Sequence, residues 1–267
     1  FGSDRIEALR GTHGVLFGAD AVGGIVNSLS SKPYYSNQKN NRSFELLGRT
    51  SSAEHSISAG FSAEVSSTKW FAEISHIERS FGDLDGGRKV GRQKNTGDDV
   101  KGSQARLSRK LSDNANLIFG IQKNFLDDVP RTHKTIDGLT WEGLSRGKEI
   151  WRRLDQDRNL YFGKIDWENI DGIANSGQLI VSLHSHEQER NRMKSNSGVA
   201  TEGDLQTFSL EDFGLTARFV RDDFFLGSLA YGAEWHHEKL VSGGYKFDAN
   251  SNRTTNLVQG PLAADAL

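Results

Sequence analysis

Apolar and polar residues alternate with a period of two beyond residue 42, and this pattern constrains the fold more than any other feature. In NANLIFGIQKNF, the residues Ala115, Leu117, Phe119 and Ile121 fall on one face, and SGQLIVSLHSHEQ and FGLTARFV repeat the pattern. Such alternation is typical of β-strands with one apolar face. About nine such segments occur, most of them near the 9–11 residues of a tilted membrane strand rather than the roughly 5–6 of a globular strand.

The lengths of the connections also alternate along the chain. Short turns are expected near 64–69, 111–116, 168–176 and 220–224, and long polar connections near 79–101, 125–156 and 188–206, with another after about 240. Short turns at one end and long loops at the other are typical of outer-membrane barrels. The sequence therefore predicts an all-β fold, with a transmembrane antiparallel β-barrel favoured. A soluble all-β sandwich with one half-buried face per strand remains the alternative.

A glycine cluster, GADAVGG, lies near the N-terminus and matches the beginning of a phosphate-binding P-loop. Gly18 and Gly23 have the required spacing, but Gly24 and Ile25 stand where the lysine and the hydroxyl residue must be. Without the ammonium and hydroxyl groups, the loop lacks its main contacts to phosphate and magnesium. A nucleotide site is therefore excluded here.

The same stretch, DRIEALRG followed by VLFGADAVGGIVN, resembles the end of the plug domain of TonB-dependent outer-membrane receptors. The matching positions are Ile6, Glu7, Leu9, Arg10, Gly11, Leu16, Gly18, Ala21, Gly23, Gly24, Ile25 and Asn27. Thr12 departs from the usual proline, which leaves the loop geometry there less fixed. A motif that spans nearly thirty positions is far more specific than a glycine pair.

The resemblance implies a barrel of about 22 strands that encloses a plug. Residues 1–40 would be the C-terminal part of the plug domain, and residues 41–267 the N-terminal part of the outer-membrane β-barrel. The long connections would then be extracellular. The segment that contacts TonB, most of the plug and the remaining strands would lie outside this chain.

Candidate site residues fall into two groups. The first is the plug motif, in which glycines permit positive φ or close backbone approach, and charged residues pair either with the barrel wall or locally: Glu7, Arg10, Gly11, Gly18, Gly23, Gly24 and Asn27. The second is a ligand-binding group, with three histidines expected on the lumen face and two residues of the long loop 129–162: His184, His186, His236, Arg131 and Trp141. Imidazole is a common ligand of iron and haem, and the alternative for the histidines is an ordinary polar lumen lining.

Several chemistries are excluded or unsupported. The chain has no cysteine, so it contains no disulfide and no thiolate metal site, and its net charge of −2 argues against a nucleic-acid partner. His186 begins a zinc-protease motif, but Arg190 replaces the second histidine ligand. Calcium binding at the FGDLDGG loop, which contains Asp83 and Asp85, is left open against a solvated loop. No catalytic residues, resident metal or cofactor are predicted, and the chain is not expected to be an enzyme.

The function expected from the resemblance is import of a scarce nutrient across the outer membrane of a Gram-negative-type bacterium. The ligand would be an iron siderophore, haem or cobalamin, and the partners would be TonB and outer-membrane lipid. A soluble ligand-binding module, for carbohydrate for example, and a passive porin or an outer-membrane enzyme are the alternatives. The scaffold does not select among ligands.

Overall fold

In the computed structural model, the described residues are 5–12, 23–37, 40–88, 90–138, 140, 145–169, 172 and 174–257. The strands are β1 (Arg5–Arg10), β2 (Gly24–Leu29), β3 (Asn41–Ser51), β4 (Ser56–Ser66), β5 (Trp70–Phe81), β6 (Leu84–Asp85), β7 (Arg92–Gln93), β8 (Asp98–Ser112), β9 (Ala115–Pro130), β10 (Glu149–Trp167), β11 (Ser176–Asn196), β12 (Val199–Phe224), β13 (Gly227–Asp248) and β14 (Arg253–Asn256). No helix within these ranges is long and apolar enough to cross a membrane.

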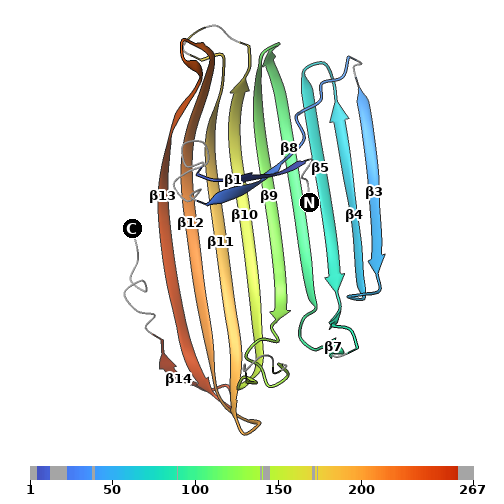
Figure 1. The fold of residues 1–267 in the computed structure, drawn as a ribbon, viewed down its shortest axis with the longest axis vertical. Coiled ribbons are helices and arrows are strands. Elements are labelled where there is room, and N and C mark those ends of the chain that lie inside the picture. The colour runs from blue at the N-terminus through green and yellow to red at the C-terminus, as the bar shows by residue number, and fades with distance from the viewer. Residues whose placement is uncertain are drawn as a thin grey trace.

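Ten of the strands form one antiparallel sheet in the order β14-β13-β12-β11-β10-β9-β8-β5-β4-β3 (Figure 1). Apart from the short β6 and β7, which pair with each other, each strand from β3 onward pairs with its neighbour in the sequence, so the sheet is a continuous meander. Nine of the ten strands are long, with 11 to 26 residues. The all-β, antiparallel fold class predicted from the alternation is confirmed.

The two longest connections lie at the same end of the sheet. The ends of β4, β8, β10 and β12 and the turns 67–69, 113–114 and 225–226 lie at the short-turn end, at the top of Figure 1. The segments 82–97 and 131–148 lie at the other end, which we call the long-loop end. Both are shorter than expected, because β5, β8, β9 and β10 each extend further than the alternation of apolar residues indicates.

The expected long loop at 188–206 is wrong. Strand β11 continues to Asn196 and β12 begins at Val199, so the connection is only two residues, Ser197 and Gly198. Both residues have positive φ, 52° and 85°, as a tight two-residue hairpin turn requires. The expectation of a further loop soon after residue 240 is also wrong, because β13 continues to Asp248.

The two faces of the sheet differ in polarity. Residues in one register row across the sheet are apolar and exposed, as the alternation predicted: Leu107, Phe119, Val181, Leu215 and Trp235. We call this side the apolar face. The opposite side, the polar face, carries Gln104, Arg106, Ser108, Ser182 and His184.

The N-terminal segment covers part of the polar face. Strands β1 and β2 pair antiparallel as a separate ribbon, which crosses in front of the sheet in Figure 1. The segment that follows reaches the sheet, since the Tyr35 hydroxyl lies 2.5 Å from the Ser108 hydroxyl. Ser108 has no exposed surface, and Phe71 and Ile118 on the same face are also buried. One group of buried residues of the sheet therefore lies where the N-terminal segment reaches it, and another, which includes Met193 and Asp204, lies at the long-loop end.

Candidate functional site

The two described halves of the glycine motif form the β1–β2 ribbon. Glu7 lies opposite Asn27, and Arg10 opposite Gly24. Gly24 has φ 149°, and a Cβ atom there would lie 2.7 Å from a backbone oxygen of β1, so only glycine fits without a shift. The backbone N–H of Gly11, at φ 103°, donates to the carbonyl of Gly23 at 3.2 Å and closes the ribbon.

The other two glycines of the motif are Gly18 and Gly23. Gly18 lies outside the described residues. A Cβ atom added at Gly23 would have no described atom within 4 Å apart from its chain neighbours, so close approach is not what requires glycine there.

The charged motif residue Glu7 has a local partner. Its carboxylate pairs with Arg5, on the same strand, at 2.8 Å, and both side chains are partly exposed. An exposed pair of this kind contributes about 0–1 kcal/mol. For Glu7, the structure therefore shows the local pairing rather than a contact with the sheet.

A buried ionic cluster attaches the N-terminal segment to the sheet instead. The Arg106 side chain is 7% exposed and its partner Glu73 is 8% exposed. Arg106 Nε donates to Glu73 Oε2 at 2.9 Å, and its terminal nitrogens donate to the Ser31 carbonyl at 2.7 Å and to the Ser31 hydroxyl at 3.0 Å. Gln104 donates to the other Glu73 oxygen at 2.9 Å. Arg106 thus joins the Glu73 carboxylate of β5 to the segment that follows the glycine motif.

The three candidate histidines lie on the polar face, on two strands. His184 and His186 are neighbours on β11, with ring centres 6.4 Å apart. Arg158 Nε donates to His184 Nε2 at 2.9 Å, which occupies that nitrogen's lone pair. His236 on β13 is bound through Nδ1 to Asp212, with 3.1 Å to each carboxylate oxygen.

Asp212, the partner of His236, also lies directly opposite His184 in the register of β11 and β12. His184 and His186 lie in the middle of their strand, since β11 continues for ten residues beyond His186. Within the described residues, no group of three histidine, cysteine or carboxylate side chains is placed to hold a metal ion. His186 packs instead edge-on against Phe208, with ring centres 5.1 Å apart. The polar face at this level combines imidazoles, one guanidinium and an aromatic ring.

Of the two candidate loop residues, Arg131 and Trp141, only Arg131 is described in the structure. Trp141 lies outside the described residues. Arg131 is exposed and lies at the long-loop end, immediately after β9. Burial lowers the pKa of Arg152, and the nearby charges of Arg131 and Arg190 lower it further. Arg131 is therefore one member of a cationic group at this end of the sheet.

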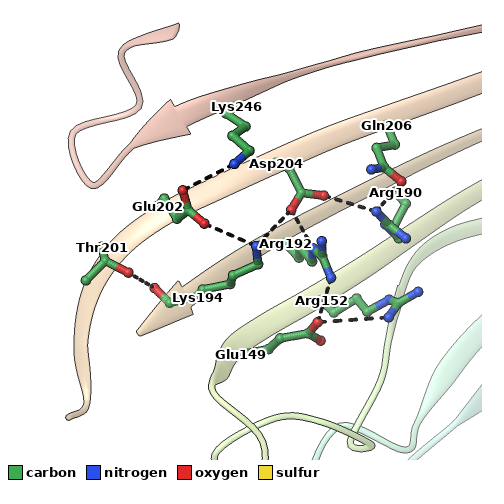
Figure 2. Close-up of polar contacts among 10 residues, drawn as sticks. All are labelled: Glu149, Arg152, Arg190, Arg192, Lys194, Thr201, Glu202, Asp204, Gln206 and Lys246. Atoms are coloured by element: carbon green, nitrogen blue, oxygen red, sulfur yellow. Dashed lines mark hydrogen bonds and ion pairs between the residues drawn. The ribbon is translucent and has the colours of Figure 1, made fainter. Parts of the chain in front are cut away.

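A charged network at the long-loop end is the feature that the sequence analysis missed (Figure 2). Asp204, only 2% exposed, accepts from Arg192 Nε at 2.6 Å and from Arg190 at 3.1 Å, and it lies 3.7 Å from the Lys194 ammonium. Glu149, 5% exposed, accepts from Arg192 at 3.0 Å. Since these residues alternate along β11 and β12, the period of two in the polar segment was the signal that could have revealed them.

The acidic loop considered for calcium has an internal structural role. Asp83 Oδ1 accepts the backbone N–H groups of Thr96 and Gly97, at 3.1 and 3.3 Å, and Asp83 Oδ2 lies 3.6 Å from Arg92. These contacts close the segment between β5 and β8. Its carboxylate is thus engaged by the protein itself.

Comparisons with known proteins identify the fold. No protein-family model and no curated protein matches the sequence. Among solved structures, the fold is similar to the folds of two receptors for ferric complexes, in agreement with the fold that the resemblance in the sequence implies. The ferric yersiniabactin uptake receptor FyuA from Yersinia pestis is similar with a TM-score of 0.58 at 12% identity. The ferripyoverdine receptor of the outer membrane of Pseudomonas aeruginosa, bound to ferripyoverdine, is similar with a TM-score of 0.56 at 11% identity.

The matched regions differ in extent between this chain and the two receptors. The matches cover 93% and 96% of this chain but only 46% and 34% of the two receptors. The chain therefore spans less than half the length of either receptor. At this level of identity, the likeness establishes the fold and leaves the ligand open.

Proposed function

We propose that the chain is part of a TonB-dependent outer-membrane receptor that imports a scarce nutrient without bond chemistry. In this proposal, residues 1–40 are the end of the plug domain and residues 41–267 the first part of the barrel. The apolar face contacts lipid, because large apolar side chains such as Phe119 and Trp235 are exposed along it. The polar face lines the lumen, and the long-loop end is extracellular.

The observation that carries this proposal is the attachment of the N-terminal segment to the polar face. A soluble sandwich would cover its apolar face and leave its polar face in water. Here the N-terminal segment covers the polar face, through Ser31 bound to Arg106 and Tyr35 in contact with Ser108. A polar face covered by its own N-terminal segment is the arrangement of a plugged barrel.

An iron complex is the first ligand class to test. Both similar receptors bear the names of ferric siderophores, yersiniabactin and pyoverdine. The polar face offers guanidinium, imidazole and aromatic groups together at Arg158, His186 and Phe208. Such groups suit a charged iron chelate, and haem and cobalamin are the further candidates.

The test measures uptake in cells that express the complete protein. We expect the protein in the outer-membrane fraction, with an electrophoretic mobility that changes on heating. Uptake of a labelled ferric complex should depend on both the protein and TonB, with a strain lacking TonB as the control. Uptake that continues without TonB would indicate a passive pore, and recovery of the protein in the aqueous fraction would contradict the proposal.

A further inference from the structure

The strands at the long-loop end place cationic side chains against one another on the polar face. Arg152 on β10 lies directly opposite Arg192 on β11, and Arg190 is a diagonal neighbour. Like charges in directly opposite positions destabilise a sheet. Four cations lie within 4.0 Å of two buried carboxylates, Glu149 and Asp204: Arg152, Arg190, Arg192 and Lys194. The charge of Arg131 adds to them through its effect on Arg152, and Glu202, 3.2 Å from Lys194, is a third carboxylate. The group therefore has an excess of positive charge.

The internal carboxylates neutralise some of these cations and engage others only weakly. Arg192 is bound by both acids, at 2.6 Å to Asp204 and 3.0 Å to Glu149. The Arg152 side chain makes no hydrogen bond to any described residue, and its ion pair is a distant one, 4.0 Å to Glu149 (Figure 2). Its side chain is nevertheless only 19% exposed.

A second donor in the group is also unused. Arg190 contacts Asp204 and Gln206 through one terminal nitrogen, while its Nε is buried without a partner among the described residues. A buried donor without an acceptor costs about 1–3 kcal/mol, and more where the group is charged. Two guanidiniums with unused donors therefore lie on the same patch of the polar face. A buried acceptor, Glu149 Oε2, also has no partner among the described residues, so donors and acceptors are not matched within this group.

We propose that Arg152 and Arg190, with Arg131 at the rim, form a binding subsite for a compact oxyanion group such as a phosphate or carboxylate. Guanidinium donors bind such groups in bidentate geometry, and the surrounding cations strengthen the attraction. This inference rests on the proposed function, because it assigns an oxyanion group to the imported ligand. The subsite lies on the polar face and so takes the anion from a soluble molecule rather than from lipid.

The test is a matched pair of variants at adjacent positions. Arg153 follows Arg152 but lies on the opposite face, where it donates to the Asp128 carboxylate at 2.7 Å. Calorimetric titration of the purified complete protein with inorganic pyrophosphate should show a loss of affinity of about tenfold or more in Arg152→Gln, and no loss in Arg153→Gln. Arg190→Lys, which keeps the charge but not the fork of donors, should also weaken binding.

Thermal stability separates a binding role from a structural one. Because the Arg152 side chain lies among like charges without a hydrogen bond to any described residue, Arg152→Gln should keep or raise Tm while it loses pyrophosphate binding. Equal affinities in the two glutamine variants would overturn the subsite, and so would binding of anionic phosphatidylglycerol vesicles without binding of pyrophosphate. If the wild-type protein supports TonB-dependent uptake but does not bind pyrophosphate, the subsite is wrong and the receptor function stands.

Discussion

The ionic cluster around Arg106 gives the sharpest prediction about stability. Arg106→Met leaves the Glu73 carboxylate, 8% exposed, without its cation, and Glu73→Leu leaves the guanidinium with only Ser31 as a hydrogen-bond partner among the described residues. Removal of one partner from a buried ion pair costs about 3–5 kcal/mol, because the remaining charge stays desolvated. Each single variant should therefore lower the free energy of unfolding by roughly this amount.

The double variant Arg106→Met/Glu73→Leu removes both charges together. Replacement of a whole buried ion pair by apolar residues is often close to neutral. We expect the double variant to cost no more than about 2 kcal/mol, the loss being that of the Ser31 and Gln104 hydrogen bonds to the pair. The cycle should then give a coupling of several kcal/mol between the two side chains.

Denaturant unfolding of the protein in detergent micelles, followed by tryptophan fluorescence, measures these differences. Lys32→Ala is the control, since the Lys32–Glu168 pair at 2.7 Å is exposed on both sides and should contribute less than about 1 kcal/mol. Single variants that cost no more than this control, or costs that simply add in the double variant, would refute the reasoning. Either result would mean that Arg106 is not a buried link between the segment and the sheet.

Three further predictions concern the strands and their turns. Gly198→Val should cost about 1–2 kcal/mol, visible as a lower Tm, because φ at Gly198 is 85°. Gly120→Val should cost about 1–3 kcal/mol, because a Cβ at this position would overlap the Phe162 ring, and Phe162→Ala should relieve part of this cost. The hydrogen bond and charge of Lys194, and the charge of Lys246, lower the pKa of Glu202. The ionised carboxylate therefore contributes fully to folding stability above about pH 4.5, and this contribution is lost as the pH falls. When Tm is measured as the pH is lowered, Glu202→Gln should lose less stability than the wild-type protein. The difference should be under about 1 kcal/mol, because the Glu202 side chain is largely exposed.

The apolar strands were predictable because one simple rule governs them. Side chains on one face of a strand recur at every second position, so the apolar residues Phe119, Val181 and Leu215 each mark a strand in the sequence. The rule fails where both faces are polar. There β11 and β12 continue to the turn at Ser197 and Gly198, held by charge pairs such as Arg192 with Asp204. A polar strand of this kind has the composition of a loop, so the long loop predicted at 188–206 was wrong.

The candidate site also has one part that the sequence predicted and one part that it did not. The glycine motif is local in sequence, and its described halves pair as one ribbon in the structure. The link between Ser31, Glu73 and Arg106 joins residues 33 to 75 positions apart, so it depends on the register of the whole sheet. No pattern in one sequence gives that register. The weak pairing of Arg152 is equally invisible, because it depends on which carboxylates the fold brings near.

Arg106 and Arg152 show how one face of a sheet can use the same side chain in two ways. Arg106, beneath the N-terminal segment, has a carboxylate, a carbonyl and a hydroxyl as acceptors, so its charge is fully engaged within the protein. Arg152, at the long-loop end, is also mostly buried but has no such set among the described residues. A cation whose partners are all internal contributes to stability and cannot bind anything further without breaking them. A cation with unused hydrogen-bond donors costs stability but can still bind an anion. The proposed anion subsite therefore lies at the long-loop end, where Arg152 is, and not beneath the N-terminal segment.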